Sequence, residues 1–308
     1  MKTFLPLLLA LLIVGCAEQP QAPQKAEYGH LDYYPAFETS HFTPRDVLVW
    51  LPEDYNPKER YGVLYMHDGQ MLFDRATSWN NQSWEIDSLA HAVISDKRTA
   101  PFIVVGIDNC DSTRLFDYMP RRVFDYLPSE ELQRYNTQAA DFRSDDYLKF
   151  LVEELKPFID SHYPTYPDAA HTATAGSSAG GLISLYAICE YPEVFGAAAC
   201  LSTHTPMVIA SLDQIAEAAP VWSKALRDYI AEHQPTPNSV KIYMDCGDQT
   251  LDSLYPHYQQ KVDSLFHSHG WNDNNYQSRV FAGHHHDENS WKRRFDIPLQ
   301  FIFAPKAE

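Results

Sequence analysis

Thr172-Ala-Thr-Ala-Gly-Ser-Ser-Ala-Gly-Gly181 decides the fold, because it places a G-x-S-x-G pattern between a short strand-like run and a helix-like run. The pattern centres on Ser178, with Gly176 and Gly180 two residues to either side. The glycines leave room for a sharp strand-to-helix turn that exposes the serine hydroxyl as a nucleophile. The helix dipole and free N–H groups at such a turn favour negative charge. An unreactive Gly/Ser-rich connection is the alternative.

Outward from this stretch, apolar runs of strand length alternate with amphipathic runs of helix length. The predicted strands cover residues 46–51, 61–66, 101–107, 172–175, 195–202, 240–246 and 276–281. The predicted helices cover residues 145–161, 180–190, 253–268 and the chain from Glu288 onward. The first strand should pair antiparallel with the residues before it, and Pro157 should kink or end its helix. This rhythm predicts an α/β fold with a mainly parallel sheet and helices on both faces.

A general base is expected after the last strand, where the chain reads Gly283-His-His-His286. One of the three histidines, His284, His285 or His286, should face the serine hydroxyl. Adjacent histidines also suggest a metal site, but consecutive loop residues rarely converge on one ion, and no further ligand stands at helical spacing. We therefore expect no metal. A cluster of inert surface histidines is the other alternative.

The base needs a carboxylate on its second ring nitrogen to fix its tautomer and orientation. After the predicted strand 240–246 the chain reads Gly247-Asp-Gln-Thr-Leu-Asp252, so Asp248 and Asp252 are both candidates. Asp252 could instead cap the helix that follows, and Asp248 could be a plain turn residue.

The N-terminus predicts export and lipidation. Residues 1–15 join Lys2 to an apolar run that is too short for a bilayer span of roughly 20 residues, which is typical of a signal peptide. The run ends Ile-Val-Gly-Cys16, which resembles a lipobox, so Cys16 should carry the lipid and residues 16–40 should form the lipidated cysteine and its tether. No Asp follows Cys16, which favours the outer membrane or cell surface, facing the periplasm or the exterior. Simple secretion is the alternative.

Charge and cysteine usage limit the partners. The 308 residues hold 24 Lys plus Arg against 41 Asp plus Glu, a net charge of −17. Such a surface repels phosphate backbones, so nucleic acid is not expected as a partner. Cys110, Cys189, Cys200 and Cys246 have no metal-ligand spacing. We expect them to be buried free thiols, although disulfides can form in an oxidising compartment.

Several ordered segments resemble the esterase group of α/β hydrolases, which includes enterochelin esterases, the feruloyl and acetylxylan esterases of carbohydrate esterase family one, and mycolyltransferases. The resemblance runs from about Thr43 to Phe303. The segments that carry it are Val63–Gln70 (Val-Leu-Tyr-Met-His-Asp-Gly-Gln), Gly176–Gly181, Tyr191–Gly196, Gly247–Asp252 and Gly283–Trp291. The resemblance implies an α/β-hydrolase fold with residues 41–308 as the catalytic domain, and no cofactor.

The resemblance also selects among the site residues. In the closing motif of the group, roughly G-x-x-H-x-E-x-x-W, the catalytic histidine matches His286. The most similar relatives carry a G-T-E-T-L-D loop whose last residue matches Asp252, although this chain has Asp248 where they have Thr. The backbone N–H groups of Gln70 and Ala179 would form the oxyanion hole.

These expectations combine into a serine carboxylic ester hydrolase that acts through a Ser-His-Asp triad and an acyl-enzyme, on an acylated carbohydrate or a siderophore-type ester. Trp79, Trp84, Trp271 and the Tyr-rich stretch 118–135 are candidates for a sugar-binding cleft, although aromatic residues more often belong to the core, which is the interpretation we favour. The alternatives are an acyltransferase to a sugar or other alcohol and a non-catalytic binding lipoprotein. The membrane would be contacted only through the lipid anchor. The sequence leaves the oligomeric state open.

Overall fold

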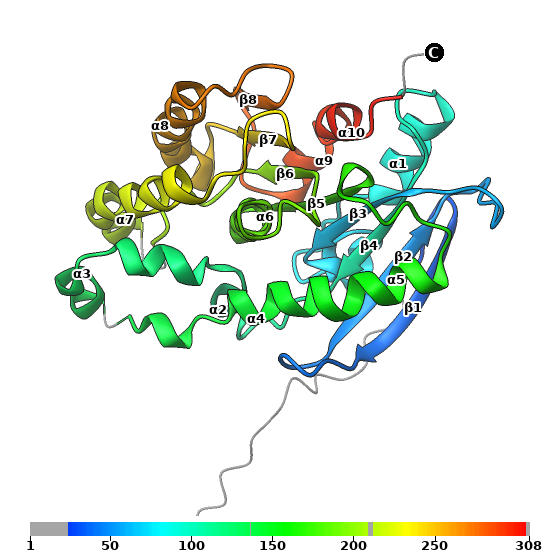
Figure 1. The fold of residues 1–308 in the computed structure, drawn as a ribbon, viewed down its shortest axis with the longest axis horizontal. Coiled ribbons are helices and arrows are strands. Elements are labelled where there is room, and N and C mark those ends of the chain that lie inside the picture. The colour runs from blue at the N-terminus through cyan, green and yellow to red at the C-terminus, as the bar shows by residue number, and fades with distance from the viewer. Residues whose placement is uncertain (1–23, 136, 209–211, 306–308) are drawn as a thin grey trace, which may run out of the picture.

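The computed structural model describes residues 24–135, 137–208 and 212–305. Their centre is an eight-stranded sheet with the order β1-β2-β4-β3-β5-β6-β7-β8 (Figure 1). The strands are β1 (His30–Phe37), β2 (Arg45–Leu51), β3 (Gly62–His67), β4 (Phe102–Ile107), β5 (Thr172–Ser177), β6 (Ala197–Leu201), β7 (Lys241–Cys246) and β8 (Tyr276–Val280). β1 with β2 and β2 with β4 pair antiparallel, whereas the remaining neighbours pair parallel. The predicted mainly parallel sheet and its first antiparallel hairpin are confirmed.

Helices cover both faces of this sheet, as predicted (Figure 1). They are α1 (Ile86–Ser95), α2 (Arg114–Tyr118), α3 (Ser129–Arg134), α4 (Ser144–Lys149), α5 (Lys156–His162), α6 (Ala179–Glu190), α7 (Leu212–His233), α8 (Tyr255–Ser268), α9 (Glu288–Lys292) and α10 (Asp296–Ile302). Side chains that alternate along a strand face opposite sides, so the sheet supplies two cores. In β2, Val47 and Val49 join the core that includes α4–α8. Leu48 and Trp50 join the core under α1, α9 and α10.

The helix that contains Pro157 does not end at the proline. α4 continues through a π-helical segment, Phe150–Leu155, into α5, whose first turn holds Pro157. Proline has no N–H to donate within a helix, and wider π turns commonly accommodate such local breaks in the hydrogen-bond ladder. The expected early end is therefore wrong, because the chain stays helical from Ser144 to His162.

The parallel strands end together at one edge of the sheet, which we call the carboxyl edge. His67 at the end of β3 pairs with Ile107, and Ser177 at the end of β5 pairs with Leu201. In sheets of this kind, ligands bind in the loops outside the carboxyl ends of the strands. The residues predicted for catalysis and for the oxyanion hole follow β3, β5, β7 and β8, so they all lie at this edge.

The cysteines follow the expectation only in part. Cys189, Cys200 and Cys246 are buried free thiols, and burial raises the pKa of each of them. Cys110 is not among these free thiols, so the expectation of a free thiol is not met for this residue. The predicted lipidation site, Cys16, lies outside the described residues. Among the residues described, no helix has the length and apolar character needed to cross a membrane.

Candidate active site

Ser178 occupies a sharp turn between β5 and α6. Its φ of 59° and ψ of −120° lie outside the regions that non-glycine residues normally adopt. The flanking glycines make this turn sterically possible, because a Cβ on Gly176 would stand 2.8 Å from the backbone of Gly180. The residues therefore form the predicted strand–turn–helix arrangement, with Ser178 partly exposed at the carboxyl edge.

Asp252 and His286 are joined directly. Asp252 Oδ1 lies 2.6 Å from His286 Nδ1. The Asp252 side chain is fully buried, and its Oδ2 accepts hydrogen bonds from Ser202 Oγ and the Gly247 N–H, both at 2.6 Å. Burial by itself would raise the pKa of Asp252, but its hydrogen bonds and the nearby His286 hold that pKa below the ordinary value. Asp252 therefore stays ionised and accepts a hydrogen bond from the Nδ1–H group of His286.

Asp248 takes the role of a turn residue. Its carboxylate accepts hydrogen bonds from the Gly283 N–H at 2.7 Å and from Gln249 Nε2 at 2.8 Å, and the residue is partly exposed. These bonds brace the loop that carries the histidines, but they do not involve a histidine ring. Of the two candidate aspartates, Asp252 is the one that contacts His286.

The three neighbouring histidines make contacts with different residues. His284 Nδ1 lies 3.2 Å from Arg294 Nη1, whereas the backbone N–H of His285 donates to Ser290 Oγ at 2.9 Å. Within the part of the chain that the structure describes, no three His, Cys, Asp or Glu side chains are grouped so that they could hold a metal ion.

A layer of buried polar side chains supports Asp252 from behind. Ser202 Oγ accepts hydrogen bonds from Trp291 Nε1 at 2.8 Å and Arg294 Nη2 at 2.9 Å while it donates to Asp252. Arg294 is itself fixed by Asp245 through Nη2–Oδ1 and Nε–Oδ2 contacts of 2.9 and 3.1 Å. Sequence reasoning used Trp291 only as part of a motif and assigned no role to Ser202 or Arg294.

Tyr255 lies against both Ser178 and His286. Its ring meets the His286 ring edge-on, with centroids 5.5 Å apart, and its hydroxyl contacts the Ser178 side chain. The same hydroxyl lies 2.7 Å from His204 Nδ1, while His204 Nε2 lies 2.9 Å from the Val208 carbonyl oxygen. A carbonyl only accepts, so Nε2 carries the His204 proton and Nδ1 accepts from Tyr255. Sequence reasoning also missed this pair, because nothing in the spacing of residues 204 and 255 indicates contact.

The loop after β3 lies beside the first turn of α6. Asp68 has a φ of 61°, and a Cβ built on Gly180 would stand 3.3 Å from its Oδ2. The Asp68 carboxylate is held by Arg114 through two contacts of 2.7 Å and by Asn109 Nδ2 at 2.6 Å. Burial would raise the pKa of Asp68, but the Arg114 charge and hydrogen bonds hold it below the ordinary value. Gln70 and Ala179 thus stand on adjacent elements at the carboxyl edge.

The aromatic candidates divide into core and surface residues. Trp84 and Trp271 are buried and belong to the two cores, so the core interpretation is confirmed for these two residues. In the Tyr-rich stretch, Tyr118 is also buried. Trp79 is 81% exposed. Its loop contacts the start of α9, which follows the three histidines, because the next residue, Asn80, donates from Nδ2 to Glu288 Oε2 at 2.8 Å.

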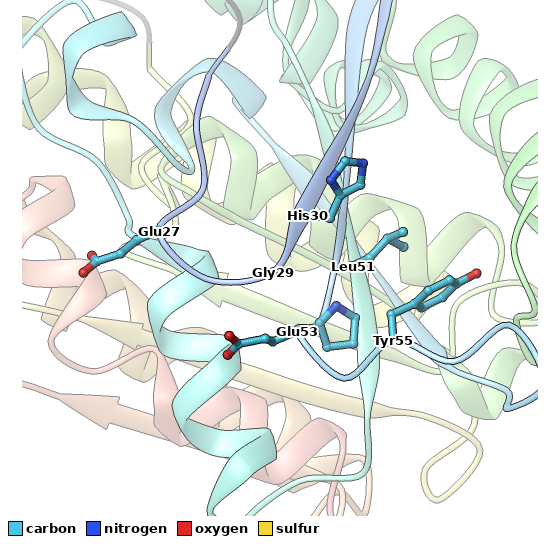
Figure 2. Close-up of a pocket in the computed structure, with 7 residues that line it drawn as sticks. Glu27, Gly29, His30, Leu51, Glu53 and Tyr55 are labelled. Atoms are coloured by element: carbon cyan, nitrogen blue, oxygen red, sulfur yellow. The ribbon is translucent and has the colours of Figure 1, made fainter.

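A pocket of about 360 Å³ lies away from these residues (Figure 2). It is lined by Glu27, Gly29, His30, Leu51, Pro52, Glu53 and Tyr55. Leu51 ends β2, which runs antiparallel to β4 with Trp50 opposite Val104, so the pocket opens at the edge opposite the carboxyl ends. It is therefore separate from the Ser178 region.

A serine in a strained turn between a strand and a helix, at the carboxyl edge of a sheet with this strand order, defines the α/β-hydrolase class. A solved ferulic acid esterase has the same fold, with a TM-score of 0.64 at 20% identity over 90% of this chain and 98% of that one. The family model described as "Putative esterase" matches residues 40–301. The chain belongs to this esterase family.

Two curated relatives are longer proteins than this chain. An endo-1,4-beta-xylanase/feruloyl esterase of Xylanibacter ruminicola is 27% identical over 207 residues, 65% of this chain and 22% of that protein. An iron(III) salmochelin esterase of Escherichia coli is 24% identical over 220 residues, 70% of this chain and 45% of that protein. The chain thus matches less than half the length of either relative.

Proposed function

We propose that the protein is a serine carboxylic ester hydrolase with Ser178 as nucleophile, His286 as general base and Asp252 as the orienting acid. The 2.6 Å contact between Asp252 and His286 is the observation that carries the proposal. It holds the imidazole proton on Nδ1 and leaves Nε2 free to accept a proton. Family membership supports the same chemistry.

In the proposed acylation step, Ser178 Oγ attacks the ester carbonyl carbon while its proton moves to His286 Nε2. The oxyanion that forms accepts hydrogen bonds from the backbone N–H groups of Gln70 and Ala179. Collapse of this intermediate breaks the ester C–O bond, and His286 returns the proton to the departing alcohol. The acyl group is then bound to Ser178.

Deacylation repeats these steps with water. Water gives a proton to His286 as it attacks the acyl carbon, and the second tetrahedral intermediate releases the acid while Ser178 regains its proton. A sugar or other alcohol in place of water would make the enzyme an acyltransferase. Analysis of the products with and without an acceptor alcohol distinguishes the two, since transfer forms a new ester.

We further propose that the substrate is an acylated carbohydrate or a siderophore-type ester. Two relatives are a feruloyl esterase and a salmochelin esterase. The exposed Trp79, on the loop bonded to Glu288, offers a flat apolar surface for an aromatic or sugar ring. A small-molecule or glycan ester is therefore the expected partner.

The first test is hydrolysis of p-nitrophenyl acetate and butyrate by the full-length chain and by Ser178→Ala. Circular dichroism checks that both proteins are folded. Activity in the parent alone supports the proposal and justifies assays on feruloyl sugars, acetylated xylans and siderophore esters. Equal activity in both proteins would remove Ser178 from the mechanism. Substrate binding by a folded parent without turnover would favour a binding lipoprotein.

We also propose that Cys16 is lipidated after removal of residues 1–15 and anchors the enzyme at the cell envelope. The lipobox-like sequence supports this. Cells fed radiolabelled palmitate should incorporate label into the wild-type chain and not into Cys16→Ala. An unlabelled wild-type chain in the culture medium would indicate secretion instead.

A further inference from the structure

Residues 24–29, which we call the N-terminal strap, cross the face of the sheet that α1 covers. The backbone N–H groups of Glu27 and Tyr28 both donate to the Asp87 carboxylate at the start of α1. The Tyr28 carbonyl oxygen accepts a hydrogen bond from Trp50 Nε1 at 2.7 Å. Figure 2 shows the strap turning at Glu27 and Gly29 beside the pocket before it enters β1. The strap is thus fixed to the body of the enzyme at this end.

The other end of the strap contacts the loop from Asp68 to Asp74, which we call the oxyanion loop. Gln24 Nε2 donates to the Gly69 carbonyl oxygen at 3.0 Å. Gln24 Oε1 accepts from the backbone N–H groups of Phe73 at 3.1 Å and Asp74 at 3.3 Å. One carboxamide therefore bonds the loop at both of its ends.

The bond to Gly69 bears directly on the proposed oxyanion hole. The Gly69 C=O and the Gln70 N–H belong to the same planar peptide group, in which the two bonds point in opposite directions. A donor that fixes the Gly69 oxygen therefore also fixes the direction of the Gln70 N–H.

Most other contacts of the oxyanion loop do not involve the Gly69–Gln70 peptide group. Arg114 and Asn109 hold the Asp68 side chain, and Asp108 lies so close to Gly69 that a Cβ there would stand 2.5 Å from Asp108 Oδ1. These contacts fix where the loop lies. Two donors reach the Gly69 carbonyl oxygen. One is the Leu72 N–H within the turn, at 3.2 Å, and the other is the Gln24 side chain.

We propose that Gln24 is a positioning residue that aligns the Gln70 N–H for the transition state, and that the strap thereby makes the segment before β1 part of the catalytic machinery. The inference rests on the proposed esterase function and on Gln70 as oxyanion donor. Misalignment of such a donor weakens binding of the developing oxyanion more than binding of the ground-state ester.

Steady-state kinetics of full-length variants on p-nitrophenyl butyrate test the proposal. Gln24→Ala should lower kcat about tenfold and leave KM within about twofold, because loss of a complete oxyanion donor costs about 10²–10³-fold and the donor here is only misaligned. Gln24→Glu keeps an acceptor for Phe73 and Asp74 but turns a carboxylate toward the Gly69 oxygen, so it should not restore kcat. Lys25→Ala, at the exposed next position, is the matched control and should behave as the parent.

Amide hydrogen exchange separates positioning from general stability. Gln24→Ala should speed exchange at Phe73 and Asp74 while the urea midpoint of unfolding stays close to that of Lys25→Ala. Parent-like kcat in Gln24→Ala, full rescue by Gln24→Glu, or a loss of kcat that only follows a loss of folded protein would each overturn the inference. A folded parent without esterase activity would contradict the proposed function instead.

Discussion

Asp252 and Asp248 lie four residues apart in one loop, yet their surroundings differ completely. Both oxygens of Asp252 are hydrogen-bonded inside the protein, whereas Asp248 is partly exposed and braces Gly283. A buried carboxylate persists as an anion only when such bonds compensate for lost hydration. The site therefore uses burial to make one aspartate a fixed partner for His286.

Substitution of each aspartate by asparagine should separate their roles. Asp252→Asn should lower kcat by about 10³–10⁴-fold, because an amide favours the wrong His286 tautomer. Asp248→Asn, with the same change in charge, should keep kcat within about threefold. Hydrolysis of p-nitrophenyl butyrate measures both variants. The assignment fails if Asp248→Asn is the inactive one.

The residues that support the site were largely beyond sequence reasoning. Ser178 could be predicted because its glycines and its place between a strand and a helix are local features. The choice of His286 and Asp252 needed the resemblance to a family. Ser202 and Arg294 could not be found, because they reach Asp252 only through folding that joins β6 to the C-terminal helices. Polar pairs of large sequence separation leave no local signal.

Among the secondary-structure elements, most strands and the helices α6 and α8 were predictable, whereas the longest helix, α7, and the helical irregularities were not predicted. Buried strands such as β3 and β4 are continuous apolar runs, which identify them directly. The π-helical segment Phe150–Leu155 precedes Pro157, and α9 and α10 are separate helices where the spacing of Trp291, Phe295 and Leu299 predicted one. The same limit applies to the tryptophans, since only the packed structure shows that Trp84 is buried.

The loop that carries Trp79 should affect substrate choice without affecting the chemistry. Trp79→Ala should raise KM for a feruloyl sugar ester by about fivefold, since a stacked ring contributes on the order of 1 kcal/mol, and should leave p-nitrophenyl acetate hydrolysis unchanged. Val280→Ala, another exposed apolar residue, serves as control. Unchanged KM for every bulky ester would exclude Trp79 from substrate binding, while equal losses on both substrates would indicate a structural role.

At the scale of the whole molecule, the strand order brings four distant loops to one edge of the sheet. The loops after β3, β5, β7 and β8 each supply one part of the proposed site. The strap adds a fifth segment, which comes from the N-terminal side and contacts the first of these loops. In an enzyme attached through Cys16, the residue that contacts the oxyanion loop, Gln24, would follow the anchor by only eight residues.

The buried histidines make the stability of the whole molecule depend on pH. Burial lowers the pKa of His204 to about 4 and that of His67 to about 3, whereas an unfolded histidine has a pKa of about 6.5. As the pH falls below about 6.5, the unfolded chain takes up protons that the folded chain does not, so the free energy of unfolding decreases. For His204 this loss is complete near pH 4.

Urea unfolding followed by circular dichroism between pH 7 and pH 4.5 should show this dependence. The variant His204→Gln lacks one titrating group, so its stability relative to the parent should improve by about 2 kcal/mol over this range, at about 1.4 kcal/mol per pKa unit. His30→Gln, at an exposed position, should follow the parent at every pH. Parallel curves for the parent and His204→Gln would mean that His204 titrates alike in the folded and unfolded chains, and the assignment of a neutral, Tyr255-bonded His204 would then be wrong.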